Sequence, residues 1–202
     1  MPLLVRPCHH HRFRAVLNDS FRLRREVFEA GAAAGGLECD PFDGNAAFYL
    51  VNLDPAGRVI ATVRATPDSA GWADAAIPRG PGVVELARLC ADPRLPGEER
   101  RRTLEALRAG LALLFLRHGW TQAVVIGHDR HIQPFIRSGM TTRPLGPPAL
   151  LPGDSRLTLS VMASDPDRHR WAAEFMAGRL ARLQDPDEDP SLFTRYGDRA
   201  VA

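Results

Sequence analysis

Residues 47–65 read AFYLVNLDPAGRVIATVRA, and this stretch decides the fold class. Its two apolar runs, 47–53 and 58–65, are rich in the β-branched and aromatic residues that favour strands. Between them the segment Asp54–Gly57 (DPAG) has the composition of a turn. We therefore predict two neighbouring strands joined as a β-hairpin.

Further regular elements are predicted on both sides of the hairpin. Upstream, Asp19 or Ser20 can cap a helix over about residues 21–30. Downstream we predict a strand over 83–90, a long helix over 98–118, a strand over 123–127, a small helix over 131–137, a strand over 156–163 and a helix over 167–183. Because helices and strands mix without strict alternation, we predict an α+β fold around a mixed sheet.

The composition is that of one soluble domain. The chain has 202 residues, 45% of them hydrophobic, and a net charge of +2, so neither nucleic acid nor a membrane surface is an expected partner. The three cysteines show no C-x-x-C spacing, and no apolar run suffices for a signal peptide or a membrane span. We expect a cytoplasmic protein with a single domain over residues 1–184 and a polar, loose tail over 185–202.

The segment Glu38–Asp43 (ECDPFD) places three carboxylates within six residues. Arg24 precedes it on the predicted helix, and Arg64 follows on a predicted strand. This order of acids and arginines suggests a polar pocket for a zwitterionic small molecule. Bracing of the loop by Asp43 is the alternative. The spacing lacks the glycine and the oxygen pattern of a calcium loop, so no metal is expected.

Glu85 is the candidate for acid–base chemistry. It lies in the predicted strand VVELARLC (83–90), where apolar neighbours favour burial and a pKa raised toward the range of a general base. A glutamate in an edge-strand salt bridge is the alternative. Because side chains alternate along a strand, Glu85 and Arg88 should point to opposite faces unless a bulge intervenes.

Three adjacent histidines, His9, His10 and His11, follow Cys8. Adjacent residues on an extended segment point in different directions, and no second cluster of ligands is evident. We therefore expect a solvated histidine cluster, with a transition-metal site as the alternative.

Four motifs, taken in order, resemble those of the acyl-homoserine-lactone synthases, the autoinducer synthases of bacterial quorum sensing. They are Arg24-x-x-x-Phe28, Glu38-x-Asp40-x-x-Asp43, Arg64 and Glu85-x-x-Arg88. The segments LRREVF (23–28), GRVIATVRATP (57–67) and IRSGMTTRPLGPP (136–148) agree as well. The resemblance spans about residues 6–163. It implies a GNAT-like fold, a mixed twisted sheet flanked by helices in three α/β/α layers.

The resemblance also implies an activity. The family transfers an acyl group from acyl-carrier protein to the amine of S-adenosylmethionine, and the product cyclises to a lactone as methylthioadenosine leaves. S-adenosylmethionine is thus a substrate, no cofactor is implied, and acyl-CoA is the alternative donor.

The family's site residues can be placed on matching positions. Glu85 takes the place of the catalytic general base. The substrate-binding positions are Arg24, Phe28, Glu38, Asp40, Asp43, Arg64 and Arg88. Phe28 is expected to face the adenine or the sulfonium, and Arg88 to pair with the acidic segment.

Two further features are expected of such a site. Backbone N–H groups can hold the oxyanion where strands splay, and residues 83–89 beside 123–127 are the candidate opening. The candidates for setting the acyl-chain preference are Val125, Met140, Leu159 and Val161.

The chain departs from the family pattern at several places, three of which bear on the site. Residues 31–36 read GAAAGG where the family carries a tryptophan, and Trp72 is a candidate replacement. Ala87 stands at the serine of the family's E-x-S-R motif, and Leu89 at the aromatic that follows. Two other functions therefore stay open: a GNAT-type N-acyltransferase for another amine, without lactonisation, and a non-catalytic relative that binds a ligand or a partner protein.

Overall fold

The computed structural model describes most of the chain. The described residues are 1–29, 36–44, 46–67, 80–127, 132–133, 135–136, 140–147, 149–151, 155–164 and 183–197, with backbone alone at residue 140 and over 149–151 and 155–164. They form two compact units. The first comprises Met1–Arg64, Arg88–Gly110 and Leu180–Ala202, and the second Ala65–Ala87 and Leu111–Arg179. The boundaries of the predicted single domain over 1–184 stay a prediction.

The first unit contains the predicted hairpin. Strand β2 (Phe48–Leu53) pairs with the short strand β1 (Leu3–Val5) on one side, and the order continues through β3 (Val59–Pro67) to β4 (Val83–Ala91). The turn between β2 and β3 closes with a 2.9 Å hydrogen bond from the Asp54 N–H to the Arg58 carbonyl. Gly57 adopts φ 80° there, a conformation that glycine tolerates. The predicted hairpin is thus confirmed.

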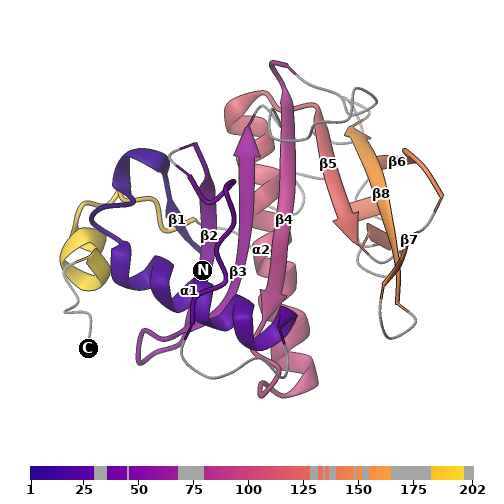
Figure 1. The fold of residues 1–202 in the computed structure, drawn as a ribbon. Coiled ribbons are helices and arrows are strands. Elements are labelled where there is room, and N and C mark those ends of the chain that lie inside the picture. The colour runs from indigo at the N-terminus through magenta and orange to yellow at the C-terminus, as the bar shows by residue number, and fades with distance from the viewer. Residues whose placement is uncertain are drawn as a thin grey trace. The chain divides into compact units, whose positions relative to one another are not determined.

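Helices cover both faces of β2 (Figure 1). On one face, Tyr49 and Val51 pack in a core with residues of helix α1 (Arg14–Phe28). On the other, the Asn52 side chain donates a 3.0 Å hydrogen bond to the Thr103 carbonyl of helix α2 (Gly97–His118). Because β2 side chains alternate between the faces, this unit has the predicted three-layer α/β/α order.

Close packing of α2 on β2 depends on Gly110. A Cβ atom there would lie 2.8 Å from Leu50 Cδ1. Farther along, α2 buries Leu111, Leu114 and Phe115 and ends before Gly119, whose φ of 63° is the usual left-handed helix stop. The helix was predicted over 98–118, and its bounds are confirmed.

The second unit makes the sheet mixed. The first half of β4 runs parallel to β5 (Gln122–Gly127), which pairs antiparallel with β8 (Ser155–Ser164). Strand β8 in turn pairs antiparallel with β6 (Met140–Pro144) and with β7 (Ala149–Leu151). One parallel pair among antiparallel ones confirms the α+β class with a mixed sheet.

Helix α1 begins earlier than predicted, at Arg14 rather than near residue 21. Ser20 does not cap it, because its hydroxyl donates a 3.0 Å hydrogen bond to the Val16 carbonyl within the helix. Val16 and Leu17 are buried in the core, so tertiary packing extends the helix toward its N-terminus.

The expectation of a loose C-terminal tail is not met over residues 185–197. Leu192 belongs to the core of the first unit, beside Phe13 and Val16. Asp185 is buried and receives a 2.6 Å hydrogen bond from Arg6. A turn of π-helix, η2 (Phe193–Gly197), follows. Packing against residues far away in the sequence therefore orders this polar segment.

Some predicted features lie outside the described residues, namely Trp72, the segment 31–35 and the helix over 167–183. Of the small helix over 131–137, residues 132–133 and 135–136 are described and are helical. Within the described part of the chain, no helix is both long and apolar enough to span a membrane.

Candidate functional site

The acidic loop (residues 36–44) is shaped by its own carboxylates. The Asp43 N–H donates to the Asp40 carbonyl at 3.0 Å, and the Phe42 N–H donates to Asp40 Oδ1 at 2.8 Å. In return, the Asp40 N–H donates to Asp43 Oδ2 at 2.9 Å. Aspartates that bind nearby backbone amides stabilise tight turns, so the sequence D-x-x-D folds this loop locally.

Arg24 of α1 binds the loop at both ends. Its Nε donates to Glu38 Oε2 at 2.6 Å, and its two Nη atoms donate to the two Asp43 oxygens at 2.7 Å each. The Arg24 side chain is only 1% exposed. A planar guanidinium suits this two-pronged contact, which an ammonium cannot copy.

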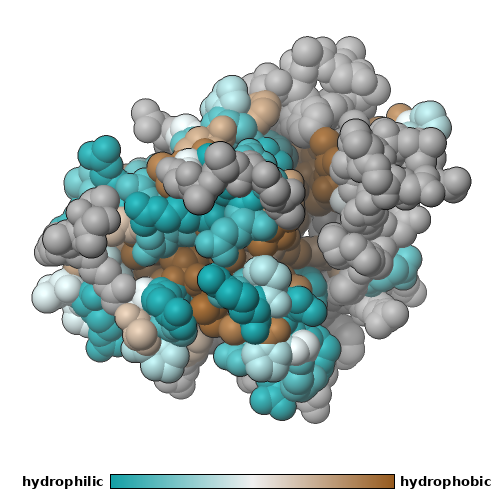
Figure 2. Space-filling model, turned by 60° about the horizontal axis from the view of Figure 1, so that its bottom comes forward, coloured by the Kyte–Doolittle hydropathy of each residue, from teal (hydrophilic) through white to brown (hydrophobic). Residues whose placement is uncertain are grey.

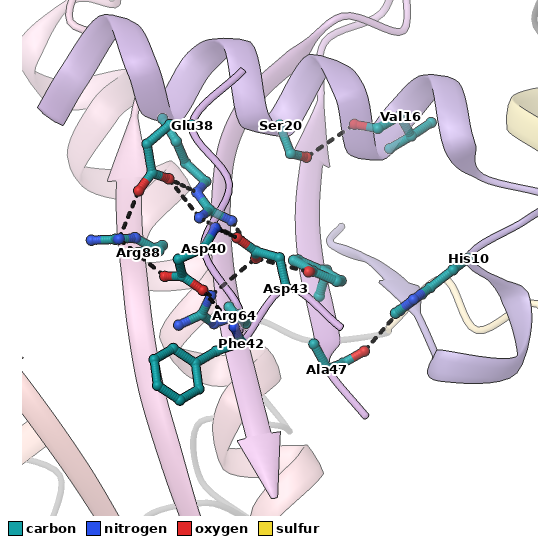
Figure 3. Close-up of polar contacts among 12 residues, drawn as sticks. His10, Val16, Ser20, Glu38, Asp40, Phe42, Asp43, Ala47, Arg64 and Arg88 are labelled. Carbon is teal, nitrogen blue, oxygen red and sulfur yellow. Dashed lines mark hydrogen bonds and ion pairs between the residues drawn. The ribbon is translucent and has the colours of Figure 1, made fainter. Parts of the chain in front are cut away.

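Two more arginines bind the same carboxylates (Figure 3). Arg64 of β3 lies 2.5 Å from Asp40 and 3.1 Å from Asp43. Arg88 of β4 lies 2.6 Å from Glu38 and 3.0 Å from Asp40. The expected pairing of Arg88 with the acidic segment is confirmed. Side chains from helix α1 and from strands β3 and β4 thus converge on one loop, and these residues all belong to the first unit.

We call this set the acidic-loop network: Arg24, Glu38, Asp40, Asp43, Arg64 and Arg88. Its three cations balance its three carboxylates. Burial alone would raise the pKa of Asp43, but the bonds from Arg24 and from the Asp40 N–H lower it from 3.8 to about 2. Likewise, burial would lower the pKa of Arg24, yet Asp43 and Glu38 raise it. Both groups are therefore charged at neutral pH.

The network has an inner and an outer part. Arg24 and Arg64 are almost completely buried, as is Asp43. Asp40 is 18% exposed and Arg88 33% exposed. The two outer residues can therefore meet a ligand, while the inner ones hold the loop in place.

Each arginine of the network also lies near a phenylalanine ring. The guanidinium carbon is 5.0 Å from the ring centre for Arg24 on Phe21 and 5.7 Å for Arg88 on Phe28. Phe28, expected to face a ligand, is 46% exposed at the end of α1. It therefore combines a cation contact with apolar surface open to a ligand.

Figure 2 shows apolar residues (brown) exposed in a band among hydrophilic ones on the face it draws.

Strand β4 does not keep a simple alternation. Arg88 adopts φ 59°, the single non-glycine residue with positive φ in the described part of the chain. A left-handed residue interrupts the extended backbone in the way a β-bulge does. The backbone therefore departs from regular strand geometry at Arg88, and the faces to which Glu85 and Arg88 point stay a prediction.

Glu85 is buried on β4, 4% exposed, as expected for this apolar sequence. It belongs to the second unit, whereas the acidic-loop network belongs to the first. Its role as a general base stays a prediction.

The β4–β5 pair ends early within the second unit. Its described register runs from Val83–Gln122 to Leu86–Val125. Strand β5 continues for two more residues, Ile126 and Gly127, beside β8. This is the region predicted to expose backbone N–H groups for an oxyanion, and that role stays a prediction. Of the acyl-chain candidates, Val125 is buried, and the other three have no described side chain.

Of the three histidines expected to be solvated, His11 is exposed, whereas His9 and His10 are packed against the protein. His9 is buried and lies 3.1 Å from Asp187, and His10 Nε2 lies 2.8 Å from the Ala47 carbonyl. The chain packs its C-terminal segment and β2 against these rings. Among the described residues, no group of three His, Cys, Asp or Glu side chains could hold a metal ion.

Tyr49 is a site residue that the sequence did not indicate to us. Its hydroxyl donates a 2.9 Å hydrogen bond to Asp43 Oδ1. A usable signal was present, because a tyrosine in a buried strand needs a partner for its hydroxyl.

The fold matches that of GNAT-like acyltransferases. An acyl-CoA N-acyltransferase from Pseudomonas aeruginosa superposes with a TM-score of 0.54 at 14% identity, over 81% of this chain and 99% of that one. The likeness is greater for BjaI, a CoA-dependent acyl-homoserine lactone synthase solved with SAM and isopentyl-CoA. There the TM-score is 0.72 at 21% identity over 92% of each chain. For MesI, another CoA-dependent synthase, the TM-score is 0.69 at 19% identity, over 93% of this chain and 100% of that one.

Sequence comparison points the same way. An acyl-homoserine-lactone synthase from Agrobacterium fabrum is 27% identical in an alignment 168 residues long that covers 74% of this chain and 80% of that protein. No protein-family model matches the chain. The chain therefore resembles the acyl-homoserine-lactone synthases in sequence and in fold, as its motifs predicted.

Proposed function

We propose that this protein is an acyltransferase that makes an acyl-homoserine lactone. The amine of S-adenosylmethionine attacks the carbonyl of an acyl thioester, an amide forms, and the thiol leaves. The carboxylate then attacks the carbon next to the sulfonium, which closes the lactone and releases methylthioadenosine. The product would serve as a quorum-sensing signal, made in the cytoplasm from its substrates there.

One observation carries this proposal. The six charged residues that the family motifs single out lie up to 64 positions apart in sequence, from Arg24 to Arg88, yet they bind one another as a single network. Independent salt bridges have no reason to converge on one loop. A shared binding site does give them such a reason, and the proteins with a similar fold include BjaI, solved with SAM.

The network suits S-adenosylmethionine as a substrate. This molecule carries an ammonium, a sulfonium and a carboxylate, so its recognition requires both signs of charge together with apolar surface. In our proposal the partly exposed Asp40 meets a cation, the partly exposed Arg88 meets the carboxylate, and the ring of Phe28 meets the adenine or the sulfonium. Glu38, Asp43, Arg24 and Arg64 keep these groups in place.

Glu85 is the proposed general base. The amine is protonated in water at neutral pH and must lose a proton before it can attack the thioester. A buried carboxylate is suited to accept that proton, directly or through a water molecule.

The identity of the acyl donor is a more specific part of the proposal. The sequence resemblance implies acyl-carrier protein, whereas BjaI and MesI are CoA-dependent synthases. We therefore propose an acyl thioester as the donor, to be tested first as acyl-CoA and then as acyl-carrier protein.

The proposal is tested by incubating the full chain with S-adenosylmethionine and a series of acyl-CoA or acyl-carrier-protein donors. Mass spectrometry should detect an acyl-homoserine lactone and methylthioadenosine in equal amounts. Absence of both with every donor would overturn the proposal.

A GNAT-type N-acyltransferase is the second candidate, favoured by the likeness to the Pseudomonas aeruginosa enzyme and by Ala87 at the family's serine position. It would form an acylated amine without releasing methylthioadenosine.

A further inference from the structure

Tyr49 lies in the core beneath the acidic loop, on β2. Its side chain is almost fully buried, and its hydroxyl reaches Asp43 Oδ1 at 2.9 Å. A buried hydroxyl that donates to a carboxylate forms a charge-assisted hydrogen bond, stronger than a neutral one. The sheet therefore contacts the loop through this residue.

Asp43 receives donors from four places. Arg24 contributes two hydrogen bonds, and the Asp40 N–H and Tyr49 contribute one each. Arg64 adds an ion pair at 3.1 Å. The two arginines are shared with other carboxylates, Glu38 and Asp40. Among the described side chains that donate to Asp43, Tyr49 is thus the one that is not shared with a second carboxylate of the network.

The phenol ring of Tyr49 is itself held in position. Phe21 and His10 contact it edge-on, with ring centres 6.0 and 5.4 Å away. His10 in turn lies within hydrogen-bond distance of the Ala47 carbonyl. Burial and the nearby charge of Asp43 raise the pKa of Tyr49, so its hydroxyl stays protonated and remains a donor.

We propose that Tyr49 is a positioning residue for the proposed reaction. Its hydrogen bond fixes the orientation of the Asp43 carboxylate, and Asp43 fixes the turn that carries Asp40 to the ligand. The inference rests on the proposed function for its effect on the substrate. Its effect on the loop does not depend on catalysis.

Two measurements on Tyr49→Phe test the proposal. At saturating acyl donor, the KM for S-adenosylmethionine should rise about tenfold while kcat changes less than about twofold, because one charge-assisted hydrogen bond is lost. The second is the hydrogen-exchange rate of the Asp40 and Asp43 amides, whose N–H groups are hydrogen-bonded within the loop to Asp43 Oδ2 and to the Asp40 carbonyl. That rate should rise about tenfold as the loop opens more often.

The chain offers matched controls. Tyr196→Phe removes the same atom from the other tyrosine and should change neither quantity. In an Asp43→Asn background, Tyr49→Phe should have a smaller effect, because the hydrogen bond that it removes no longer ends on a charged carboxylate. An equal effect in both backgrounds would show a packing role and overturn the proposal, and so would an unchanged exchange rate of the loop amides. If the enzyme makes no lactone, that exchange rate still tests the role of Tyr49 separately from the proposed function.

Discussion

Arg24 and Asp43 form two parallel hydrogen bonds of 2.7 Å, and both side chains are almost completely buried. They join helix α1 to the acidic loop. A buried charge that keeps its partner is tolerated, whereas one that loses its partner is strongly destabilising. The pair is therefore where the fold of this loop is most sensitive to substitution.

Arg24→Met should lower the free energy of unfolding by about 3–5 kcal/mol, because it removes the buried cation that Glu38 and Asp43 share and leaves them only Arg88 and Arg64. Urea unfolding of the two proteins measures this difference. Arg22→Met is the matched control, two residues earlier on the same helix. Arg22 forms an exposed pair with Asp19, so the expected loss is below about 1 kcal/mol. Equal losses in the two variants would contradict the buried pair.

Stability should fall in acid through Asp43. The folded-state pKa of about 2 lies below the ordinary 3.8, so the stabilisation is present above about pH 4 and is lost as the pH falls toward 2. The shift corresponds to about 2 kcal/mol. Urea unfolding between pH 5 and pH 2 should show a loss of stability that is smaller in Asp43→Asn than in the native protein by this amount, because other carboxylates with lowered pKa values titrate in both proteins. Parallel curves for the two proteins would contradict the assignment to Asp43.

The backbone conformation of Arg88 leads to a prediction that does not depend on the charge of its side chain. Arg88→Gly and Arg88→Ala lose the same ion pairs, but only alanine pays a steric cost at φ 59°. The glycine variant should therefore be more stable than the alanine variant by about 1 kcal/mol. At the neighbouring Ala87, which has no positive φ, substitution by glycine should instead destabilise, by about 0.5–1 kcal/mol. Thermal unfolding of the three variants decides the order.

Glu85→Gln should keep the fold and lose lactone formation by at least about 100-fold, because glutamine cannot accept the proton of the amine. Release of methylthioadenosine provides the rate, and thermal unfolding provides the check on the fold. Glu99→Gln, in the first turn of α2, is the control and should retain full activity. Unchanged turnover in Glu85→Gln would exclude it as the base.

The C-terminal segment should contribute to stability through Leu192. Leu192→Ala removes a buried side chain from the core of the first unit and should cost about 2–5 kcal/mol. Thr194→Ala, at an exposed position two residues on, should change stability by less than about 0.5 kcal/mol. If the two variants unfold at the same denaturant concentration, the segment is not part of the folded core.

Local sequence was sufficient where an element has its own periodicity. The helix over 98–118 and the strands over 47–53, 58–65 and 83–90 were predicted within one or two residues of the observed α2, β2, β3 and β4. In each of these elements, the spacing of the apolar residues along the sequence matches the face of the helix or strand that is buried. The start of α1 and the three-residue strand β1 were not predicted. Both segments are held in place by strand pairing or packing with residues far away in the sequence.

The sequence by itself determined the chemical types at the site: three arginines and three carboxylates, in an order that resembles a known family. It also determined the hairpin, the long helix and the α+β class. Tertiary structure alone decided which arginine binds which carboxylate, that Asp40 and Arg88 stay accessible while Arg24, Arg64 and Asp43 are buried, and that Tyr49 supports Asp43. Burial and ion pairing depend on distances between residues far apart in the chain, and local sequence does not encode those distances.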